Sequence, residues 1–433
     1  MPAFEQLTRF LLVVALILGV CHLAGALCVR LRQPPVVGEL AGALLLGPSL
    51  LGALAPGAHH ALFTPALLTT IDLAGQLGLV VFMLLLGSEL RTDLLDGDRR
   101  TVGLVVAGTI TVPFAAGFGF AASVGEWFAP RGVPFAAYLV FFGLAISITA
   151  MPVLARILTD HRVEGSPTGT LALAVASIGD GLAWAILAVV LAAKGTGDPG
   201  TVVVRGLIAV VLLIVSFTLV RPALAAVLRR AGRRGTGERA IAAFLVTGAV
   251  AFAAATDAIG LHPVIGAFLF GVLLPRGQDV VTRAGSKLND FAVVVLLPLF
   301  FASVGQKANF AAFGGREGWL LLGAGLAVAM LSKFAGTAGA ATLAGKGRRQ
   351  SLRLGALMNC RGITELVIAN VGLQHGLITP LGYTVIVLIA VVTTAITGPL
   401  ARLRAADEDL LPGVPPPVSS TRSAARAVPS RRT

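Results

Sequence analysis

The sequence predicts an all-α membrane protein with 13 transmembrane helices. Of its 433 residues, 56% are hydrophobic and only 13% are charged, and the mean hydropathy is +0.88. Soluble domains carry about 25% charged residues, so this composition excludes an ordinary soluble chain. Apolar runs of about 20 residues, long enough to cross the hydrocarbon core, recur along the sequence. Backbone groups in lipid must bond within their own segment, so these runs must be helical.

Thirteen hydrophobic segments fill residues 1–403, which we treat as one transmembrane domain. In chain order they are Phe10–Val29, Val36–Leu54, Leu67–Gly87, Val102–Val124, Pro134–Leu158, Thr168–Ala193, Val202–Leu228, Ile241–Ala255, Pro263–Leu274, Leu288–Val304, Trp319–Ala344, Leu354–Gln374 and Leu381–Leu403. Residues 404–433 are rich in Pro, Ser and Arg. That composition is typical of a disordered tail.

The positions of the basic residues predict the orientation in the membrane. Most of the 34 lysines and arginines fall in alternate loops and in the tail, whereas Lys333 and Arg361 lie inside segments. Cytoplasmic loops carry the excess of Lys and Arg in membrane proteins. We therefore expect a multi-pass protein of the inner or plasma membrane, with the N-terminus outside and the C-terminus, including the tail, in the cytoplasm.

An internal repeat relates the two halves of the chain. Segment 2 contains Pro35-Val36-Val37-Gly38 and segment 9 contains Pro263-Val264-Ile265-Gly266. Segments 5 and 12 both carry a polar, helix-breaking cluster in mid-span. Both pairs are seven segments apart, so the two copies cross the membrane in opposite directions. Inverted repeats of this kind are typical of secondary transporters with a midplane substrate site; chance similarity between Gly/Pro-rich segments is the alternative.

Asp180 is the candidate ion carrier. It lies in segment 6, in the stretch Ala176–Gly181, between two glycines that leave the carboxylate uncovered. A charged residue at the centre of a spanning helix costs about 2.5–3.5 kcal/mol on insertion scales, so such residues need a functional reason. Burial raises the pKa of a carboxyl group and a nearby cation lowers it, so a carboxylate under both influences can hold a proton or a metal cation in turn. A structural aspartate paired with a helix end is the alternative.

Segment 5 offers oxygen ligands at membrane depth. Pro152 has no amide hydrogen, and its ring displaces the carbonyl group of Ile148, so we expect the helix to be discontinuous there. Carbonyl groups freed in this way are tolerated only where they line a cavity. Ser147 and Thr149 add further oxygens, which suit hard monovalent cations. The alternative is a simple proline kink.

Segment 12 and segment 11 carry the remaining buried charges. Arg361 and Glu365 are four residues apart, so they either neutralise each other on one helix face or contact the ion directly. Gly362 lies between them in the helix-breaking cluster and marks the second discontinuous helix. Lys333 has no acidic neighbour within a turn, so its counter-charge must come from another helix, and Asp180 is the candidate.

The other acidic and histidine residues carry weaker signals. Glu39 lies near a membrane interface, where it either pairs structurally or lines an ion-access funnel. Asp72 and Asp257 lie at the ends of segments and are expected to be solvated. The six histidines have no metal-binding spacing, and no nucleotide-binding glycine loop or catalytic set is present. The sequence therefore predicts a protein that is not an enzyme and has no cofactor, and whose only metal is the monovalent cation held at Asp180.

At these positions the sequence resembles the monovalent cation:proton antiporter superfamily, and its Kef/CHX-like branch most closely. The resemblance extends from about Leu11 to Leu400. The matching stretches are Gln33-Pro34-Pro35-Val36-Val37-Gly38-Glu39, Leu46-Gly47-Pro48-Ser49-Leu50, Leu84-Leu85-Leu86-Gly87-Ser88-Glu89-Leu90, Ser147-Ile148-Thr149-Ala150, Asp180 with Ala183-Trp184, Pro298-Leu299-Phe300-Phe301-Ala302, Lys333 with Gly336-Thr337, and Arg361-Gly362-Ile363-Thr364-Glu365-Leu366.

The resemblance implies the sodium/proton antiporter fold. That fold has a 6+1+6 inverted-repeat architecture, with segments 5 and 12 as crossed discontinuous helices. It also implies a homodimer and an elevator-like movement of a core domain against a dimerisation domain. By matching positions, Asp180 is the ion-carrying carboxylate and Lys333 is its basic partner. The family usually places Asp, Asn or Gln immediately before the carboxylate, whereas this chain has Gly179.

The function we expect is exchange of a monovalent cation for protons. Potassium and sodium use the same oxygen ligands, so both are candidate ions. A channel-like potassium efflux protein gated by a partner subunit is one alternative. A non-transporting membrane sensor is another, although retained charges in the membrane argue against it because of their insertion cost.

Overall fold

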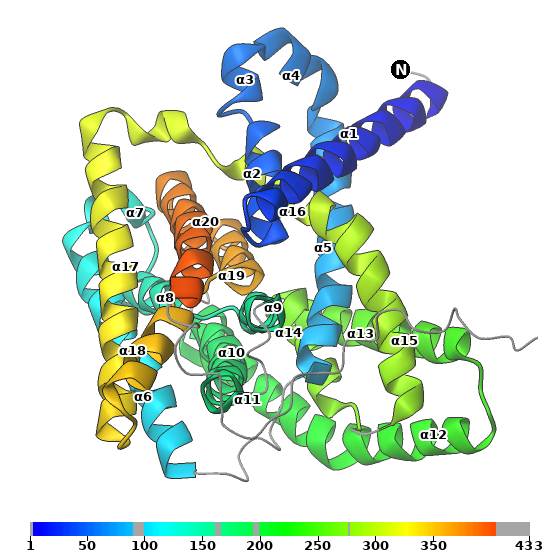
Figure 1. Cartoon of the computed structure of the whole chain (residues 1–433). Helices are drawn as coiled ribbons and strands as arrows, with labels where there is room; N and C mark the ends of the chain where they lie inside the picture. Colours follow the sequence, from blue (N-terminus) through cyan, green and yellow to red (C-terminus); the bar gives the residue numbers. More distant parts are fainter. Residues whose placement is uncertain (1–2, 90–98, 161–165, 194–198, 276–277, 404–433) are drawn as a thin grey trace, which may run out of the picture.

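The computed structural model describes residues 3–89, 99–160, 166–193, 199–275 and 278–403, and every regular element within these ranges is helical (Figure 1). The tail predicted for residues 404–433 lies outside them. The α-helices are α1 Ala3–Arg30, α2 Pro35–Leu45, α3 Leu51–Leu54, α4 Pro56–Leu62, α5 Pro65–Glu89, α6 Arg99–Ser123, α7 Gly125–Phe128, α8 Phe135–Ser147, α9 Met151–Asp160, α10 Pro167–Ala193, α11 Pro199–Val215, α12 Arg221–Arg233, α13 Glu238–Ala258, α14 Pro263–Leu273, α15 Asp279–Phe291, α16 Leu297–Lys307, α17 Arg316–Leu343, α18 Arg348–Leu357, α19 Ile363–Gln374 and α20 Pro380–Leu403. Two π-helical turns, η2 Ser216–Val220 and η3 Ala292–Leu296, join α11 to α12 and α15 to α16, and the 3₁₀ turn η4 Phe310–Phe313 follows α16.

The all-α membrane fold is confirmed. Within the described ranges, ten helices are long and apolar enough to cross a membrane, and three shorter apolar helices, Pro35–Leu45, Pro263–Leu273 and Ile363–Gln374, accompany them. The prediction of one continuous helix over Val36–Leu54 is wrong, because α2 ends at Leu45. Pro48 has no amide hydrogen for a continuing helix. Gly47 also packs against α16, and a Cβ atom there would lie 2.4 Å from the carbonyl oxygen of Gly305.

The helices form two groups that pack mainly within themselves. The first group contains α1, α2, α5, α13, α14, α15 and α16, and the second contains α6, α8, α9, α10, α17, α18, α19 and α20. Figure 1 shows α1, α5 and α15 on one side and α6, α17 and α18 on the other. The groups meet where α20 contacts α2 and η4.

The Pro-Val-Val-Gly stretch of segment 2 and the Pro-Val-Ile-Gly stretch of segment 9 have the same packing role. Each begins a helix at its proline, and each helix packs closely on the helix before it. A Cβ atom on Gly38 would lie 2.2 Å from the carbonyl oxygen of Ala24 in α1, and one on Gly266 would lie 2.1 Å from that of Phe252 in α13. Only glycine permits this approach, which is a common way to pack helices in a membrane.

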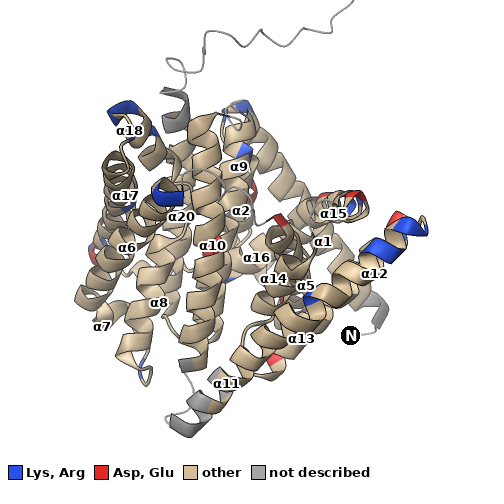
Figure 2. Ribbon diagram, turned by 90° about the horizontal axis from the view of Figure 1, so that it is seen from below, with Lys and Arg blue, Asp and Glu red and all other residues tan. Residues whose placement is uncertain are grey.

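The two ends of the helices differ in charge. Figure 2 shows the basic residues of α9 and α18 at one end, which we call the basic end, and α7 at the opposite end, which we call the far end. At the far end, the backbone NH of Thr379 donates to the carbonyl oxygen of Phe128 in α7. The side chain of Ser49 also joins the loop after α2 to the start of η4, by accepting a hydrogen bond from the NH of Phe310.

Candidate functional site

Two interrupted helices cross in the interior of the second group. α8 ends at Ser147 and α9 begins at Met151, and α18 ends at Leu357 and α19 begins at Ile363. The breaks touch, because the backbone NH of Ala150 donates to the carbonyl oxygen of Cys360 over 3.1 Å. The helix breaks predicted in segments 5 and 12 are therefore both present. Each break creates one helix N-terminus and one helix C-terminus in the interior, with unpaired NH or carbonyl groups.

Gly362 permits the close contact of the two breaks. A Cβ atom on Gly362 would lie 2.6 Å from Cγ2 of Val153 in α9 and 3.4 Å from Cβ of Ala150. Pro152 is the second residue of α9, a position where its missing NH leaves no helix hydrogen bond unmade. The proline thus starts the second half-helix and does not simply kink a continuous one.

Asp180 lies in the middle of α10, directly opposite the start of α9. The side chain is only 1% exposed, and its Oδ2 accepts a hydrogen bond from the backbone NH of Met151 over 3.3 Å. A helix N-terminus carries a partial positive charge, so it stabilises a carboxylate in this position. Among the residues that the structure describes, Oδ1 has no hydrogen-bond partner, and neither does the buried Oγ of Ser177, one turn earlier. Oδ1 can therefore accept a proton or a cation, and the hydroxyl oxygen of Ser177 can serve as a further cation ligand.

Lys333 lies in the middle of α17 and reaches the C-terminus of α8. Its Nζ donates to the carbonyl oxygen of Ser147 and, over 3.0 Å, to that of Thr109 in α6. The last carbonyl groups of a helix carry a partial negative charge, so this position stabilises the ammonium group. The buried side chains of Thr109 and Thr337 share a hydrogen bond of 2.6 Å that joins α6 to α17 beside the lysine.

The predicted ion pair between Lys333 and Asp180 is not formed. Among the described residues, Nζ of Lys333 donates to backbone carbonyl oxygens and the carboxylate of Asp180 accepts from a backbone NH, and no ion pair joins the two side chains. Each charge is instead stabilised by the end of a half-helix, the carboxylate by α9 and the ammonium by α8. The backbone dipoles of these half-helices therefore stabilise the two charges, whereas the sequence suggested that the two side chains would stabilise each other.

Arg361 and Glu365 form a buried ion pair. Nη1 of Arg361 lies 2.8 Å from Oε1 of Glu365, and both side chains are fully buried. The guanidinium group also donates to the carbonyl oxygens of Ala145 and Ile146 in the last turn of α8. Glu365 is in the first turn of α19, where the helix dipole favours a negative charge. Mutual neutralisation is thus the geometry observed, although Oε2 of Glu365 has no partner among the described residues.

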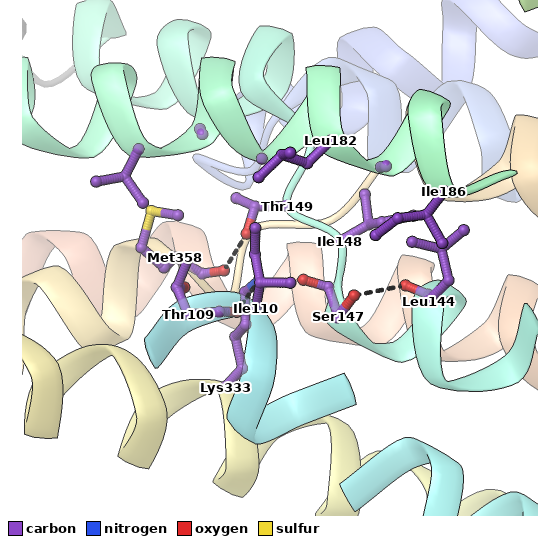
Figure 3. A pocket seen from close by; sticks show the side chains of 14 residues that line it. Thr109, Ile110, Leu144, Ser147, Ile148, Thr149, Leu182, Ile186, Lys333 and Met358 are labelled. Atoms are coloured by element: carbon purple, nitrogen blue, oxygen red, sulfur yellow. Dashed lines mark hydrogen bonds between the residues drawn. The ribbon is translucent and has the colours of Figure 1, made fainter. Parts of the chain in front are cut away.

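A small cavity lies beside the crossing. Its volume is about 10 Å³, and its lining includes Ser147, Thr149, Gly179 and Lys333 (Figure 3). This is about the space of one water molecule. The hydroxyl groups of Ser147 and Thr149 donate to the carbonyl oxygens of Leu144 and Met358, at 2.9 and 3.1 Å, so their lone pairs remain available. A Cβ atom on Gly179 would meet nothing within 4 Å.

A larger cavity opens toward the basic end between the two groups of helices. Its volume is about 480 Å³, and its lining includes Glu39, Glu89, Arg156, Pro152 and Ile363. The last two residues adjoin the two helix breaks, and Pro152 follows the residue whose NH binds Asp180. Glu39, for which the sequence left two roles open, therefore lines a cavity that reaches the crossing. We call this cavity the vestibule.

The expectation that Asp72 is solvated is wrong, whereas Asp257 is exposed as expected. Asp72 is about one quarter exposed, and its Oδ1 lies 2.6 Å from Nζ of Lys307 in α16. Ser303 and Gln76 also donate to its carboxylate. The partner lies 235 residues further along the chain, so no local pattern in the sequence could have revealed the pair.

Two further residues contribute to the site without having been predicted from the sequence, Met151 and Thr109. Both act through backbone atoms, the NH of Met151 and the carbonyl oxygen of Thr109, and almost any residue could supply these groups; proline alone lacks the NH. The only signal was indirect: Pro152 marks a new helix start, and a helix start has free NH groups.

Comparison with known proteins agrees with this geometry. The profile of the family described as "Sodium/hydrogen exchanger, transmembrane" matches residues 12–403. The chain belongs to the sodium/hydrogen exchanger family. Its residues are 34% identical over 391 positions to the Na(+)/H(+) antiporter NhaS4 of Synechocystis, covering 89% of this chain and 95% of that protein. They are 30% identical over 407 positions to the K(+)/H(+) antiporter 1 of Saccharomyces cerevisiae, covering 92% of this chain and 46% of that protein.

The solved structures show the same fold at lower sequence identity. The sodium proton antiporter MjNhaP1 of Methanocaldococcus jannaschii, at pH 8, superposes with a TM-score of 0.66 and 16% identity, covering 93% of this chain and 99% of that one. The chain spans nearly the whole of the cyanobacterial member of the exchanger family and about half of the yeast and plant members. Its family is thus one of membrane transporters, and its helical fold matches that of a solved antiporter.

Proposed function

We propose that this protein exchanges a monovalent cation, potassium or sodium, for protons through Asp180. One observation carries the proposal. A fully buried carboxylate faces the N-terminus of a half-helix where two broken helices cross, and one of its oxygens has no partner within the described part of the chain. Insertion of such a group costs energy that packing alone does not require. Relatives in the family are named for exchange of sodium, potassium or other cations with protons.

The charge balance at the crossing supports one-for-one exchange. Two acidic residues, Asp180 and Glu365, and two basic residues, Lys333 and Arg361, are each at most 1% exposed. With all four ionised the site is neutral, so a bound proton or a bound cation adds the same single charge. The two compete for Asp180, with oxygens of Ser147 and Thr149 as further cation ligands. The partial charges of the half-helices stay in place whichever of the two is bound.

We infer the membrane arrangement from the same features. The ten long and three short apolar helices, with the matched packing of Gly38 and Gly266, support 13 spans in two inverted repeats. The basic end then faces the cytoplasm and the far end faces outside. The vestibule therefore gives cytoplasmic ions access to the crossing, with Glu39 and Glu89 in its wall. The homodimer is proposed from the family resemblance.

A channel-like potassium pathway is a weaker reading of this structure. The cavity at the crossing holds only about 10 Å³, and the described residues around it are joined by direct hydrogen bonds between the two breaks. A continuous aqueous pore needs more space than one water molecule. Alternating access to a buried site suits this geometry better.

The decisive experiment is reconstitution into liposomes with sodium, potassium or lithium added in turn while internal pH is recorded. We expect a cation-driven pH change for the parent protein and none for Asp180→Asn, which keeps the size of the side chain but removes its charge. Glu317→Gln, the same chemical change at an exposed position in the first turn of α17, is the matched control and should exchange normally. Exchange that persists in Asp180→Asn would remove this carboxylate from the mechanism.

A further inference from the structure

Three polar side chains join the two groups of helices near the far end. Nζ of Lys307, the last residue of α16, lies 2.6 Å from Oδ1 of Asp72 in α5 and 2.9 Å from Oδ1 of Asn370 in α19. Asp72 and Lys307 belong to the first group, whereas Asn370 belongs to the second and is 1% exposed. We call these three residues the far-end latch.

Other hydrogen bonds cross the same boundary at this end. Oη of Tyr383 in α20 donates to the carbonyl oxygen of Val304 in α16, and the NH of Asn309 donates to Oγ1 of Thr384, both over 3.1 Å. The side chains of His262, before α14, and Gln374, at the end of α19, lie 3.1 Å apart. At the basic end, by contrast, the vestibule of about 480 Å³ separates the two groups. The structure is thus closed at the far end and open at the basic end.

α19 connects the latch to the ion site. It begins at the helix break, carries Glu365 in its first turn, and carries Asn370 less than two turns later. A displacement of the crossing relative to α16 must therefore separate Asn370 from Lys307. The ion site can reach the far side only after this separation.

We infer that Lys307 is a positioning residue of the exchange cycle: held by Asp72, it fastens α19 to α16 and keeps the ion site closed to the far side. This inference rests on the proposed exchange function, because it assigns Lys307 a step in that cycle. Lys307 touches neither the carboxylate of Asp180 nor the crossing, so its effect is on which side has access and not on the ion itself.

The chemistry of the three residues suits a contact that must be made and broken. Asn370 is neutral, so releasing it separates no opposite charges, and Lys307 remains paired with Asp72. A hydrogen bond from a charged donor is nevertheless strong enough to change an equilibrium about tenfold or more. A carboxylate in place of Asn370 would place Lys307 between two negative charges and make the release far more difficult.

The test measures access from the far side directly. Val304→Cys introduces a nearly isosteric thiol at a position that is fully buried in the closed arrangement. A membrane-impermeant maleimide is added on the far side, and labelling of position 304 is read by peptide mass spectrometry, so the native cysteines can stay. Each of three changes is added to the full chain carrying Val304→Cys, and its labelling rate is compared with that of Val304→Cys alone. The changes are Asn370→Ala, Asn370→Asp and, as a matched control at an exposed position in the vestibule wall, Asn289→Ala.

We expect Asn370→Ala to raise the labelling rate about tenfold, Asn370→Asp to lower it, and Asn289→Ala to leave it unchanged. Asn370→Asp should also lower the turnover number of exchange without changing the cation KM, and its lowered labelling rate separates this effect from misfolding, which would expose position 304 and raise labelling. If Asn370→Asp folds poorly, the double variant Asp72→Asn/Lys307→Met, which removes both charges together, should raise labelling as Asn370→Ala does.

Equal labelling rates in the parent and in Asn370→Ala, or in the parent and the double variant, overturn the inference. A failure of the proposed exchange function would give a different combination of results. In that case the parent protein itself shows no cation-driven pH change in liposomes, while the labelling rates still respond to Asn370→Ala and so support the contact as a closure of the far side.

Discussion

Removing the charge of Glu365 should destabilise the protein strongly, because Arg361 then keeps a buried charge without its counter-charge. Both side chains are fully buried and lie 2.8 Å apart. Loss of one member of a buried pair costs about 3–5 kcal/mol. The hydrogen bonds from Arg361 to the carbonyl oxygens of Ala145 and Ile146 remain, so we place Glu365→Gln near the lower end, at about 3 kcal/mol.

The measurement is the free energy of unfolding in detergent, from denaturant titration of purified protein. The double variant Arg361→Met/Glu365→Gln is the companion, since it removes both charges and should recover a large part of the stability lost in Glu365→Gln. The reasoning fails if Glu365→Gln unfolds like the parent protein but no longer exchanges ions. That result would show that Glu365 contacts the transported ion and that its pairing with Arg361 is incidental to stability.

Three further changes test the site at other positions. A Cβ atom at Gly179 meets nothing within 4 Å, so Gly179→Asp introduces no backbone clash. The added carboxylate should make exchange depend on membrane potential, and rates equal at opposite imposed potentials would contradict the charge-balance argument. Gly362→Ala should slow exchange, because its methyl group would lie 2.6 Å from Cγ2 of Val153. Adding Val153→Ala should restore the rate in the same liposome assay. A double variant as slow as the single one would exclude this contact as the cause. Thr109→Val should lower the free energy of unfolding by about 1 kcal/mol, because the hydrogen bond to Thr337 is lost. Exchange should persist, because the carbonyl oxygen of residue 109 still binds Lys333. Abolished exchange with unchanged stability would contradict that division of roles.

The breaks and the buried charges could be predicted from sequence because each leaves a local mark. Pro152 in an apolar segment, and the polar run ending at Glu365, are visible without any knowledge of neighbours. The pairing of Arg361 with Glu365 was one of two open choices, since four residues of spacing puts both on one helix face.

The partners of the other charges could not be predicted. Lys333 binds carbonyl oxygens of Thr109 and Ser147, and Asp180 binds the NH of Met151. Backbone groups are the same in every residue except proline, which has no NH, so only the three-dimensional position of the helix ends makes them partners. The pair formed by Asp72 on α5 likewise depends on a helix far along the chain.

The half-helix ends that compensate the site charges belong to the same group of helices as the charges themselves. α6, α8, α9, α10, α17 and α19 supply every contact of the four buried charges described above. If this group travels as a unit, the electrostatic surroundings of the bound ion travel with it. An ion would then meet the same protein ligands from either side of the bilayer, and in a one-for-one exchange the two concentration gradients set the direction of net flow.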